Sequence, residues 1–574
     1  MAVGVSDIGV APSAPNTIYV ATGDAESGGF FGQNFSFSIG ILKSTDGGAS
    51  WKQTGLQAPQ SNTLLINRLL VHPTDPNTVY MGSNAGVYKT VDGGTNWTQI
   101  SAEICRDLEF KPTDPTILYA SIINSGVYSI RKYTVASGQW SRQLEFAQNE
   151  VARIALTTSK GNASYVYAVV AGADMGFHSF WKTTNEGTTW TKISDKSKTP
   201  NLLSFEFDGS TAGGQGMYDL AVTADPVDPK TVYVGGVNIW KSTDGGSKWN
   251  LLADWTGYYA PWVHADHHYL DFSPNGTLFS ANDGGLQKSS NYGTNWTDIS
   301  NGLAVMQFYR LATSKTDADF IIAGAQDNGT NKLNGGVWQN IQGGDGMECL
   351  IDYSDAKYIY ASLYYGELTR SVDGGNTFTQ MFDPKKVNEQ GGWVTPMIMH
   401  PSDPKILFAG LHNIWKTTDR GVNWGPISNF AGNGNFRALT IAPSNPNYIY
   451  AAAYNQLVQS TNGGTSWNIT YTAEVQISYI VVDPTKPDRI WLALSGFKDG
   501  SKVLKIDNGT LTNVSGTLPN VPVNCIVYQN NSVERLYIGT DIGVFTRDKS
   551  SKDWELFNDG LPPVVINELE IHYG

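Results

Sequence analysis

Residues 90–97 read TVDGGTNW, and close variants of this octapeptide occur seven more times along the chain of 574 residues. Asp or Asn at its third position can hydrogen-bond the backbone two residues on, and Gly at its fifth position supplies a positive φ. The closing Trp or Phe begins the next strand and covers the turn. Each octapeptide therefore predicts a hairpin turn, and its recurrence predicts stacked copies of one supersecondary unit. The other copies are STDGGASW at 44–51, TTNEGTTW at 183–190, STDGGSKW at 242–249, SSNYGTNW at 289–296, SVDGGNTF at 371–378, TTDRGVNW at 417–424 and STNGGTSW at 460–467.

The sequence around each octapeptide also repeats. Residues 66–100 read INRLLVHPTDPNTVYMGSNAGVYKTVDGGTNWTQI, which predicts four strands joined by a PTDP turn, a short loop and the octapeptide turn. Three further units keep only the closing residue, as Trp140, Trp338 and Trp554, and a degenerate copy lies near Asn513. The closing positions fall every 40 to 59 residues, the length of a four-stranded propeller blade, so the sequence predicts an all-β chain of twelve blades.

Twelve blades exceed the usual size of one propeller, which leaves two discs or an unusually large ring. A break near 302–304, after the sixth blade, favours tandem β-propellers of six to seven blades each. We expect an N-terminal propeller over 1–304 and a C-terminal propeller over 305–574. The tail GLPPVVINELEIHYG at 560–574 resembles the first strand of another blade, and the chain enters a strand at once, so we expect pieces to be missing at both ends.

Composition and charge exclude several functions. The net charge of −13 argues against a nucleic-acid or anionic-membrane partner, and no apolar run is long enough for membrane insertion. The first residues, MAVGVSDIGVA, lack the features of a signal peptide, so either the chain is cytosolic or a leader has been removed. Cys105, Cys349 and Cys525 lie in equivalent strand-like segments, show no disulfide or metal spacing, and predict small buried hydrophobes. No cofactor is expected.

The octapeptides resemble the Asp-box, or BNR repeat, of sialidases, sortilins and several glycoside hydrolases. In that family the box joins the third and fourth strands of a blade at its periphery, which implies a structural role for its carboxylates. The tandem layout resembles glycoside hydrolase family 74, the xyloglucanases, whose two seven-bladed discs face each other across a substrate cleft. Sortilin, a single ten-bladed ring, fits the blade count less well. The carboxylates assigned this structural role are Asp46, Asp92, Asp244, Asp373 and Asp419.

Aromatic residues that the repeat does not explain are candidates for ligand binding. Of the seventeen Trp, four occupy no repeat position: Trp255, Trp262, Trp393 and Trp491. The segment WTGYYAPW at 255–262 presents two of them together with two tyrosines, and rigid aromatic faces can stack on sugar rings. Packing of this long connection onto its own disc explains the same residues equally well. The aromatic candidates for substrate binding are Trp255, Tyr258, Tyr259, Trp262, Tyr364 and Trp393.

The segment HADHHYLDF at 264–272 holds three of the eight histidines of the chain. Alternation along a strand would put His264, Asp266 and His268 on one side and His267 on the other. Such a row could orient a proton carrier. Side chains four residues apart on a strand lie about 13 Å apart, too far for one ion, so the sequence predicts no metal site.

Acidic residues recur in loops that should share one face of each disc. They follow second strands at Asp24, Asp174, Asp283, Asp327 and Asp541, and Asp345 follows a fourth strand. Tight-turn formation by Asp and Gly explains many of them. The remaining candidates come from three consecutive blades around the expected junction of the discs, where a cleft is expected: His264, Asp266, His268, Asp283, Gln326, Asp327, Asn328 and Asp345.

Two functions remain open. The first is an inverting glycoside hydrolase of a β-linked polysaccharide, which needs two carboxylates about 6.5 to 9.5 Å apart; Asp327 as the acid and Asp283 are the predicted pair. The resemblance implies a base in a first-blade RTDIGG-like loop, but the nearest match is GTDIGVFTR around Asp541, in the last unit. The alternative is a non-catalytic, sortilin-type propeller that binds a protein or peptide. A sialidase is disfavoured, because the arginine triad is missing. The resemblance implies an extracellular or cell-surface protein whose partner is a polysaccharide or glycan.

Overall fold

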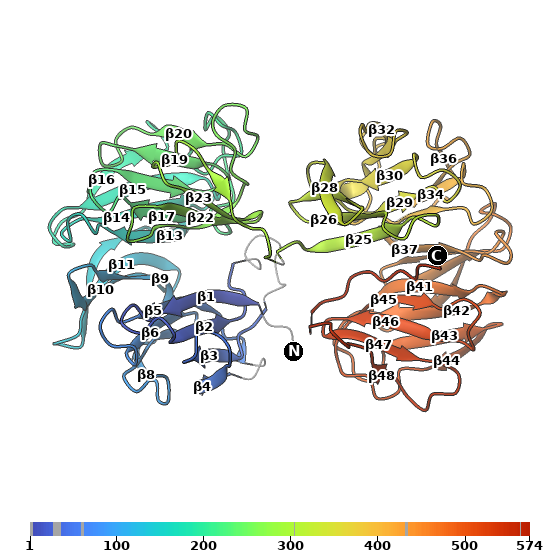
Figure 1. Cartoon of the computed structure of the whole chain (residues 1–574), viewed down its shortest axis with the longest axis horizontal. Helices are drawn as coiled ribbons and strands as arrows, with labels where there is room; N and C mark the ends of the chain where they lie inside the picture. The colour runs from blue at the N-terminus through green and yellow to red at the C-terminus, as the bar shows by residue number, and fades with distance from the viewer. Residues whose placement is uncertain are drawn as a thin grey trace. The chain divides into compact units, whose positions relative to one another are not determined.

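The computed structural model describes residues 4–26, 36–58, 62–303, 305–430, 434–562 and 564–573. The chain divides into two compact units, Val3–Val305 and Met306–Gly574. In Figure 1 the strands of the first unit run from blue to green, and those of the second run from yellow-green to red. Within the described part of the chain, no helix has the length and apolar character needed to span a membrane.

In its described residues, the first unit contains six four-stranded antiparallel sheets, each made of four consecutive strands. The predicted blades are therefore confirmed in this unit. The strands are β1 (Val5–Val10), β2 (Ile18–Thr22), β3 (Gly40–Ser44), β4 (Lys52–Gln57), β5 (Ile66–Val71), β6 (Val79–Ser83), β7 (Gly86–Thr90), β8 (Thr98–Ser101), β9 (Ile104–Lys111), β10 (Asp114–Asn124), β11 (Val127–Thr134), β12 (Gln139–Glu145), β13 (Val151–Thr158), β14 (Val166–Gly172), β15 (Phe177–Thr183), β16 (Thr191–Asp195), β17 (Ala221–Ala224), β18 (Val232–Gly235), β19 (Ile239–Ser242), β20 (Asn250–Ala253), β21 (His267–Phe272), β22 (Leu278–Asn282), β23 (Gly285–Ser289) and β24 (Thr297–Asp298).

Over the part of the second unit that the structure describes, this arrangement is repeated in six further sheets, which confirms the predicted all-β fold of twelve blades. Its strands are β25 (Phe308–Thr313), β26 (Ile321–Ala325), β27 (Gly329–Asn334), β28 (Val337–Gln342), β29 (Cys349–Ile351), β30 (Ile359–Ser362), β31 (Leu368–Ser371), β32 (Thr379–Phe382), β33 (Met397–Met399), β34 (Leu407–Gly410), β35 (Ile414–Thr417), β36 (Gly425–Pro426), β37 (Phe436–Ile441), β38 (Ile449–Ala453), β39 (Gln456–Ser460), β40 (Asn468–Thr472), β41 (Ile477–Asp483), β42 (Lys486–Leu494), β43 (Val503–Asp507), β44 (Thr510–Asn513), β45 (Val523–Tyr528), β46 (Leu536–Thr540), β47 (Gly543–Arg547) and β48 (Glu555–Leu556), with a 3-10 helix, η2 (Tyr364–Gly366), between β30 and β31.

The eight octapeptides form the turns between third and fourth strands, and all eight share three hydrogen bonds. In 417–424, Thr417 donates its hydroxyl hydrogen to Asp419 Oδ1 (2.7 Å), and its hydroxyl oxygen accepts the N–H of Gly421 (3.1 Å). Asp419 Oδ1 also accepts the N–H of Asn423 (2.9 Å). The predicted bond two residues on is therefore wrong: the acidic or amide side chain reaches the N–H four residues on, because the first-position hydroxyl already binds the N–H of the fifth residue.

The fifth-position glycine also makes room for the neighbouring blade. Gly246 has a φ of 96°, and a Cβ there would lie 2.3 Å from Cδ1 of Phe180 in the preceding blade. Buried aromatic residues of the second strands pack beside these contacts; Tyr167 and Tyr233 are fully buried. Cys105, Cys349 and Cys525 are buried free thiols, as their positions in the repeat predict.

The first strands of the N-terminal unit surround a cavity of about 700 Å³. Residues of β1, β5, β9, β13, β17 and β21 all line it. Arg68 on β5 reaches the ring of Tyr269 on β21, with 5.5 Å between the guanidinium carbon and the ring centroid. The sixth blade of this unit therefore lies close to the second across the centre, and polar side chains of the first strands face the cavity.

In the C-terminal unit, residues 564–573 lie between the last blade and the first. Ile566 donates its N–H to the carbonyl of Thr540 (2.9 Å) on β46. Farther along, Glu570 accepts the N–H of Thr313 (2.9 Å) on β25, and His572 Nε2 lies 2.9 Å from the carbonyl oxygen of Ser314. The tail thus joins the sheet that ends the unit to the sheet that begins it.

Candidate functional site

A polar cluster of the N-terminal unit centres on His268, which lines the central cavity. The imidazole lies between two carboxylates, with Nδ1 2.9 Å from Glu26 Oε2 and Nε2 2.7 Å from Asp283 Oδ1. Although burial opposes the charged form, these two contacts raise the pKa of His268 well above its usual value. The ring therefore carries both protons and donates one to each carboxylate. Glu26 also pairs with Arg153, which extends the chain of charges to β13.

Asp283 has a second hydrogen-bond donor in Tyr218, whose hydroxyl lies 2.7 Å from Asp283 Oδ2. The tyrosine ring meets the His268 ring edge-on, with centroids 4.7 Å apart. A hollow of about 270 Å³ is lined by Tyr218 and His268 together with Asp24 and Glu26. The residues of this cluster thus come from three loops, after β2, before β17 and after β22, and they meet around His268.

Asp266 lies beside this cluster and is a half-buried carboxyl group. Gln215 donates to Asp266 Oδ1 (2.9 Å), and carboxylate oxygens of Asp266 and Asp283 lie within 4.8 Å of each other. Burial, followed by the charge of Asp283, raises the pKa of Asp266 to about 6. Asp219 is fully buried, and burial followed by the charge of Asp266 raises its pKa well above the ordinary range.

The predicted alternation along 264–268 is wrong, because β21 begins only at His267 and Asp266 has a left-handed φ of 63°. Asp266 approaches Asp283 from the loop before β21, whereas His268 reaches it from the strand itself. His264 packs against the loop after β22, since a Cβ on Gly284 would lie 2.3 Å from its ring. His267 is buried against the Ser280 hydroxyl (2.7 Å), and burial lowers its pKa to about 3.

The aromatic segment 255–262 is both packed and exposed. Tyr259 stacks on Phe207, with the two rings 12° from parallel, and Trp255 donates its indole N–H to the carbonyl of Phe205 (3.3 Å). The predicted packing onto its own unit is therefore present. Tyr258 nevertheless stays 81% exposed, and about half of the surface of Trp255, Tyr259 and Trp262 is open to solvent. Both interpretations left open by the sequence thus describe part of this segment.

A second polar cluster lies in the C-terminal unit and contains the loop after β26. Asp345 Oδ1 accepts the N–H of Asp327 (2.8 Å) and the side-chain amide of Gln326 (3.1 Å). Gln326 also donates to Asp327 Oδ1 (2.8 Å), while Asn328 donates to the carbonyl of Gln326 (3.0 Å). Asp327 has a left-handed φ of 55°, so the loop itself is a tight turn. The structure therefore brings these four predicted residues together.

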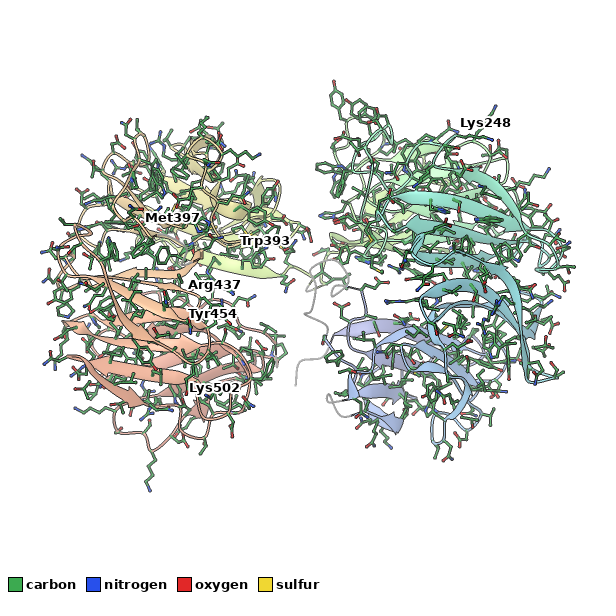
Figure 2. The ribbon with its side chains drawn as sticks, turned by 180° about the vertical axis from the view of Figure 1, so that it is seen from behind. Lys248, Trp393, Met397, Arg437, Tyr454 and Lys502 are labelled. Carbon is green, nitrogen blue, oxygen red and sulfur yellow. The ribbon has the colours of Figure 1, made fainter. Side chains whose placement is uncertain are left out.

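Aromatic residues adjoin this second cluster. Tyr309 donates its hydroxyl to Gln326 and accepts the indole N–H of Trp393 (2.9 Å). Trp393, labelled in Figure 2, stacks on Tyr364 with the ring centroids 5.7 Å apart and the planes 13° from parallel. Tyr365 meets Trp393 edge-on, and Tyr364 and Tyr365 are each about two-fifths exposed. An aromatic face therefore continues directly into a row of amide and carboxylate groups.

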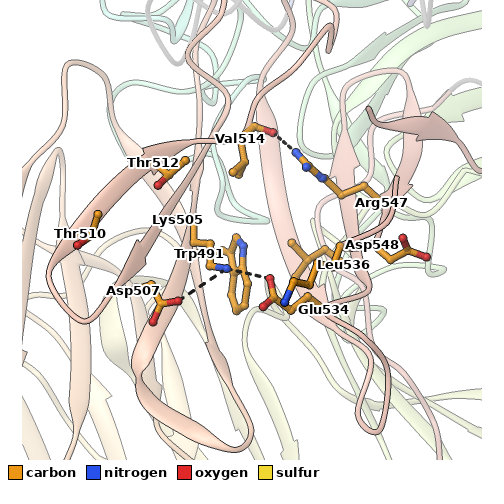
Figure 3. Close-up of a pocket in the computed structure, with 11 residues that line it drawn as sticks. Trp491, Lys505, Asp507, Thr510, Thr512, Val514, Glu534, Leu536, Arg547 and Asp548 are labelled. Atoms are coloured by element: carbon orange, nitrogen blue, oxygen red, sulfur yellow. Dashed lines mark hydrogen bonds and ion pairs between the residues drawn. The ribbon is translucent and has the colours of Figure 1, made fainter. Parts of the chain in front are cut away.

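A further hollow of the C-terminal unit contains none of the predicted site residues (Figure 3). It measures about 480 Å³ and lies between β43–β44 and β46–β47. Lys505 lies over the ring of Trp491 at 5.2 Å and binds Glu534 at 2.8 Å. Trp491 is 2% exposed, so its indole serves packing and offers no free face to a sugar.

Several members of the N-terminal cluster were not singled out from the sequence. Glu26 follows Asp24 by two residues in ATGDAES, and Asp24 accepts its N–H (2.9 Å), but only Asp24 was noted as a loop carboxylate. Tyr218 and Asp219 lie in the long connection before β17, where a polar GQGMYD stretch was the available signal. Arg153 is a charged residue within an apolar first strand.

The predicted catalytic residues belong to different units: Asp283 lies in the first and Asp327 in the second. Their assignment as a pair stays a prediction. Two other acidic residues noted from the loops stand apart from both clusters. Asp541 accepts a hydrogen bond from Asn524 (3.0 Å), and Asp174 is a half-exposed partner of Lys196.

Fold and clusters together define a two-unit β-propeller protein with carboxylate-rich, aromatic-flanked sites. No family model matches the chain. A xyloglucanase of Paenibacillus sp. is 21% identical over 87% of this chain, and the chain spans only 55% of that relative. The crystal structure of the GH74 xyloglucanase from Xanthomonas campestris is similar with a TM-score of 0.64 and 17% identity, over 97% of this chain and 86% of that one. The GH74 enzyme of Niastella koreensis has a TM-score of 0.36 and 15% identity, over 96% and 91%. The Xanthomonas structure shows that the propeller fold is shared.

Proposed function

We propose that this chain is a glycoside hydrolase-like propeller that binds a β-linked polysaccharide, of the class to which xyloglucan belongs. The observation that carries this proposal is the stacked pair Tyr364–Trp393, which continues through Tyr309 into Gln326 and Asp345. Aromatic faces cover the apolar side of a sugar ring, and adjoining amides and carboxylates bind its hydroxyl groups. The similarity to a xyloglucanase over most of the chain supports the same substrate class.

The exposed segment 255–262 supplies a second aromatic surface in the N-terminal unit. We propose that its Tyr258 and Trp262 faces bind further sugar units of the same polymer. A sortilin-type role in peptide or protein binding receives no support from the relatives described above. Action outside the cell belongs to the same proposal, because a polysaccharide substrate is encountered there.

For catalysis we propose Asp327 as the general acid and Asp283 as the second essential carboxylate. Asp327 belongs to the hydrogen-bonded loop of the C-terminal cluster. Asp283 is oriented by two donors, His268 and Tyr218. Inverting hydrolysis assigns one carboxyl group to the leaving oxygen and the other to the attacking water.

Binding and hydrolysis are tested separately on the full chain. In a panel of xyloglucan, mixed β-glucans and mucin glycans, we expect the wild type to bind xyloglucan and Trp393→Ala to bind it at least about tenfold more weakly. Phe497→Ala removes an aromatic ring that is 70% exposed in the same unit and outside the cluster, so it should bind normally. Failure of the wild type to bind any glycan, or equal binding by Trp393→Ala, would contradict the proposed surface.

Release of reducing ends then tests the acid. We expect Asp327→Asn to lower the rate at least about 100-fold while binding is retained, because proton transfer is lost and the aromatic face is intact. Equal rates for the variant and the wild type would rule out Asp327 as the acid. Binding by the wild type without any release would identify a non-catalytic polysaccharide-binding protein.

A further inference from the structure

The charges of the N-terminal cluster do not balance. Glu26 pairs with Arg153 and His268, and Asp283 pairs with His268, so two cations serve two carboxylates. Asp219 and Asp266 form no ion pair with Lys, Arg or His within the described ranges of the chain. When both carboxyl groups are ionised, two negative charges are left without a cation in a largely buried place, where an uncompensated charge is costly.

The charge imbalance is most costly at Asp219, because its carboxyl group is the most deeply buried of the four. Its side chain is 0% exposed, and the side chain within hydrogen-bonding reach of its buried oxygens is the carboxyl group of Asp266, which is another acid. The charge that acts on it most strongly is the carboxylate of Asp266. Buried carboxylates in proteins are normally satisfied by donors, cations or metal ions, so two acids that face each other need either a shared proton or a bound cation between them.

The available ligand atoms identify the chemistry of that group. Carboxylate oxygens of Asp266 and Asp283 lie within 4.8 Å of each other, and Gln215 orients Asp266 by donating its side-chain N–H to Oδ1. Asp266 turns into the cluster from a left-handed backbone position, which Asp and Asn adopt more readily than most residues. Oxygen donors without thiolate or free imidazole suit hard divalent cations, and Ca²⁺ in particular accepts irregular, carboxylate-rich geometry.

We propose that Asp219 and Asp266, next to Asp283, bind a divalent cation of the Ca²⁺ type in the N-terminal unit. The ion supplies the two positive charges that the cluster lacks. It gives the buried oxygens of Asp219 a partner and fixes the loop that carries Asp266 toward His268. This site uses carboxylate oxygens from two loops and shares only Asp266 with the predicted row of His264, Asp266 and His268.

The test is calorimetric titration of the EDTA-treated full chain with CaCl₂. We expect the wild type to bind one Ca²⁺ and Asp219→Asn to bind it at least about tenfold more weakly, since a carboxylate ligand and its charge are lost. Asp208→Asn alters an exposed turn carboxylate of the same unit and should titrate like the wild type. At the same concentration, Ca²⁺ should also raise the Tm of the wild type by more than that of Asp219→Asn.

If Asp219→Asn does not fold, Asp266→Asn replaces it, because Asn tolerates the left-handed φ at that position. Absence of any heat or Tm shift for the wild type up to about 10 mM CaCl₂ would overturn the proposal. Equal Ca²⁺ affinity in the wild type and both variants would overturn it as well. A proton shared by Asp219 and Asp266 would appear as a wild-type Tm that ignores Ca²⁺ and falls as the pH rises through the titration of the pair.

Discussion

Glu26 is a single carboxylate that forms ion pairs with residues from two distant blades of the N-terminal unit. Burial alone would raise its pKa, but the charge of Arg153 and the hydrogen bond and charge of His268 outweigh burial and lower the pKa to about 2. A depressed carboxyl pKa contributes stability above the pKa of the unfolded state, about 4.5, and this contribution is lost as the pH falls toward 2. His268 is 242 residues away in sequence, so the contact joins the first blade to the sixth.

We expect Glu26→Gln to lower the free energy of unfolding by about 1 kcal/mol at pH 7, a modest value because a third of the side chain is exposed and solvent screens the charge. The difference from the wild type should shrink between pH 4.5 and 2. Urea unfolding at a series of pH values measures this. Glu145→Gln, which alters an exposed ion pair of the same unit, is the control and should show no such pH dependence. A pH-independent difference for Glu26→Gln would refute the charge pairing.

At the scale of the structural element, the octapeptide turns come in two chemical kinds. Asp residues occupy the third position in five copies and Asn in three. Hydrogen bonds from the seventh residue and from the first-position hydroxyl lower the pKa of Asp46, Asp92 and Asp373 to about 2. Asn462 accepts the same backbone bond, at 2.9 Å from the N–H of Ser466, but does not titrate.

Low pH should therefore destabilise the turns that have Asp at the third position and leave those with Asn unchanged. Between about pH 4 and pH 2 the Asp turns lose their carboxylates, and we expect faster amide hydrogen exchange at Asn96 and Thr377 after correction for intrinsic rates. Asn295 and Ser466, at the same place in the Asn turns, serve as internal controls. Equal acceleration at all four amides would mean that the ionised carboxylates do not stabilise these turns above pH 4.

At the scale of the whole molecule, the C-terminal unit closes around a buried charge cluster supplied partly by its tail. Arg310 on β25 contacts Glu348 (3.5 Å) and Glu568 (3.2 Å), and Glu568 accepts the hydroxyl of Tyr479 (2.8 Å). Burial raises the pKa of Glu348 to about 8 and that of Glu568 to about 7, although Arg310 opposes this. One cation therefore faces two acids, and the folded unit holds protons that the unfolded chain releases above about pH 4.5.

Stability of this unit should consequently fall as the pH rises from about 4.5 to 8. We expect Glu348→Gln to remove much of that fall and to gain about 3 kcal/mol relative to the wild type at pH 8.5. Calorimetric unfolding of the full chain at pH 5 and pH 8.5 provides the measurement. Glu474→Gln changes an exposed carboxylate of the same unit and should follow the wild type. An unchanged pH slope in Glu348→Gln would show that this carboxyl is not protonated in the folded unit.

The blades, their number and the turns between their last two strands could all be predicted from the amino-acid sequence. These features depend on bonds that span four residues, as from Asp419 to Asn423, and on a spacing that recurs along the chain. Even the C-terminal cluster was readable, because Gln326, Asp327 and Asn328 are consecutive and Asp345 follows within one blade. The charges that meet in the N-terminal unit, by contrast, could be identified only from the folded structure. Glu26, Arg153, Asp219 and His268 lie on four different blades or connections, and a ring of sheets sets their contacts through packing that no local pattern records.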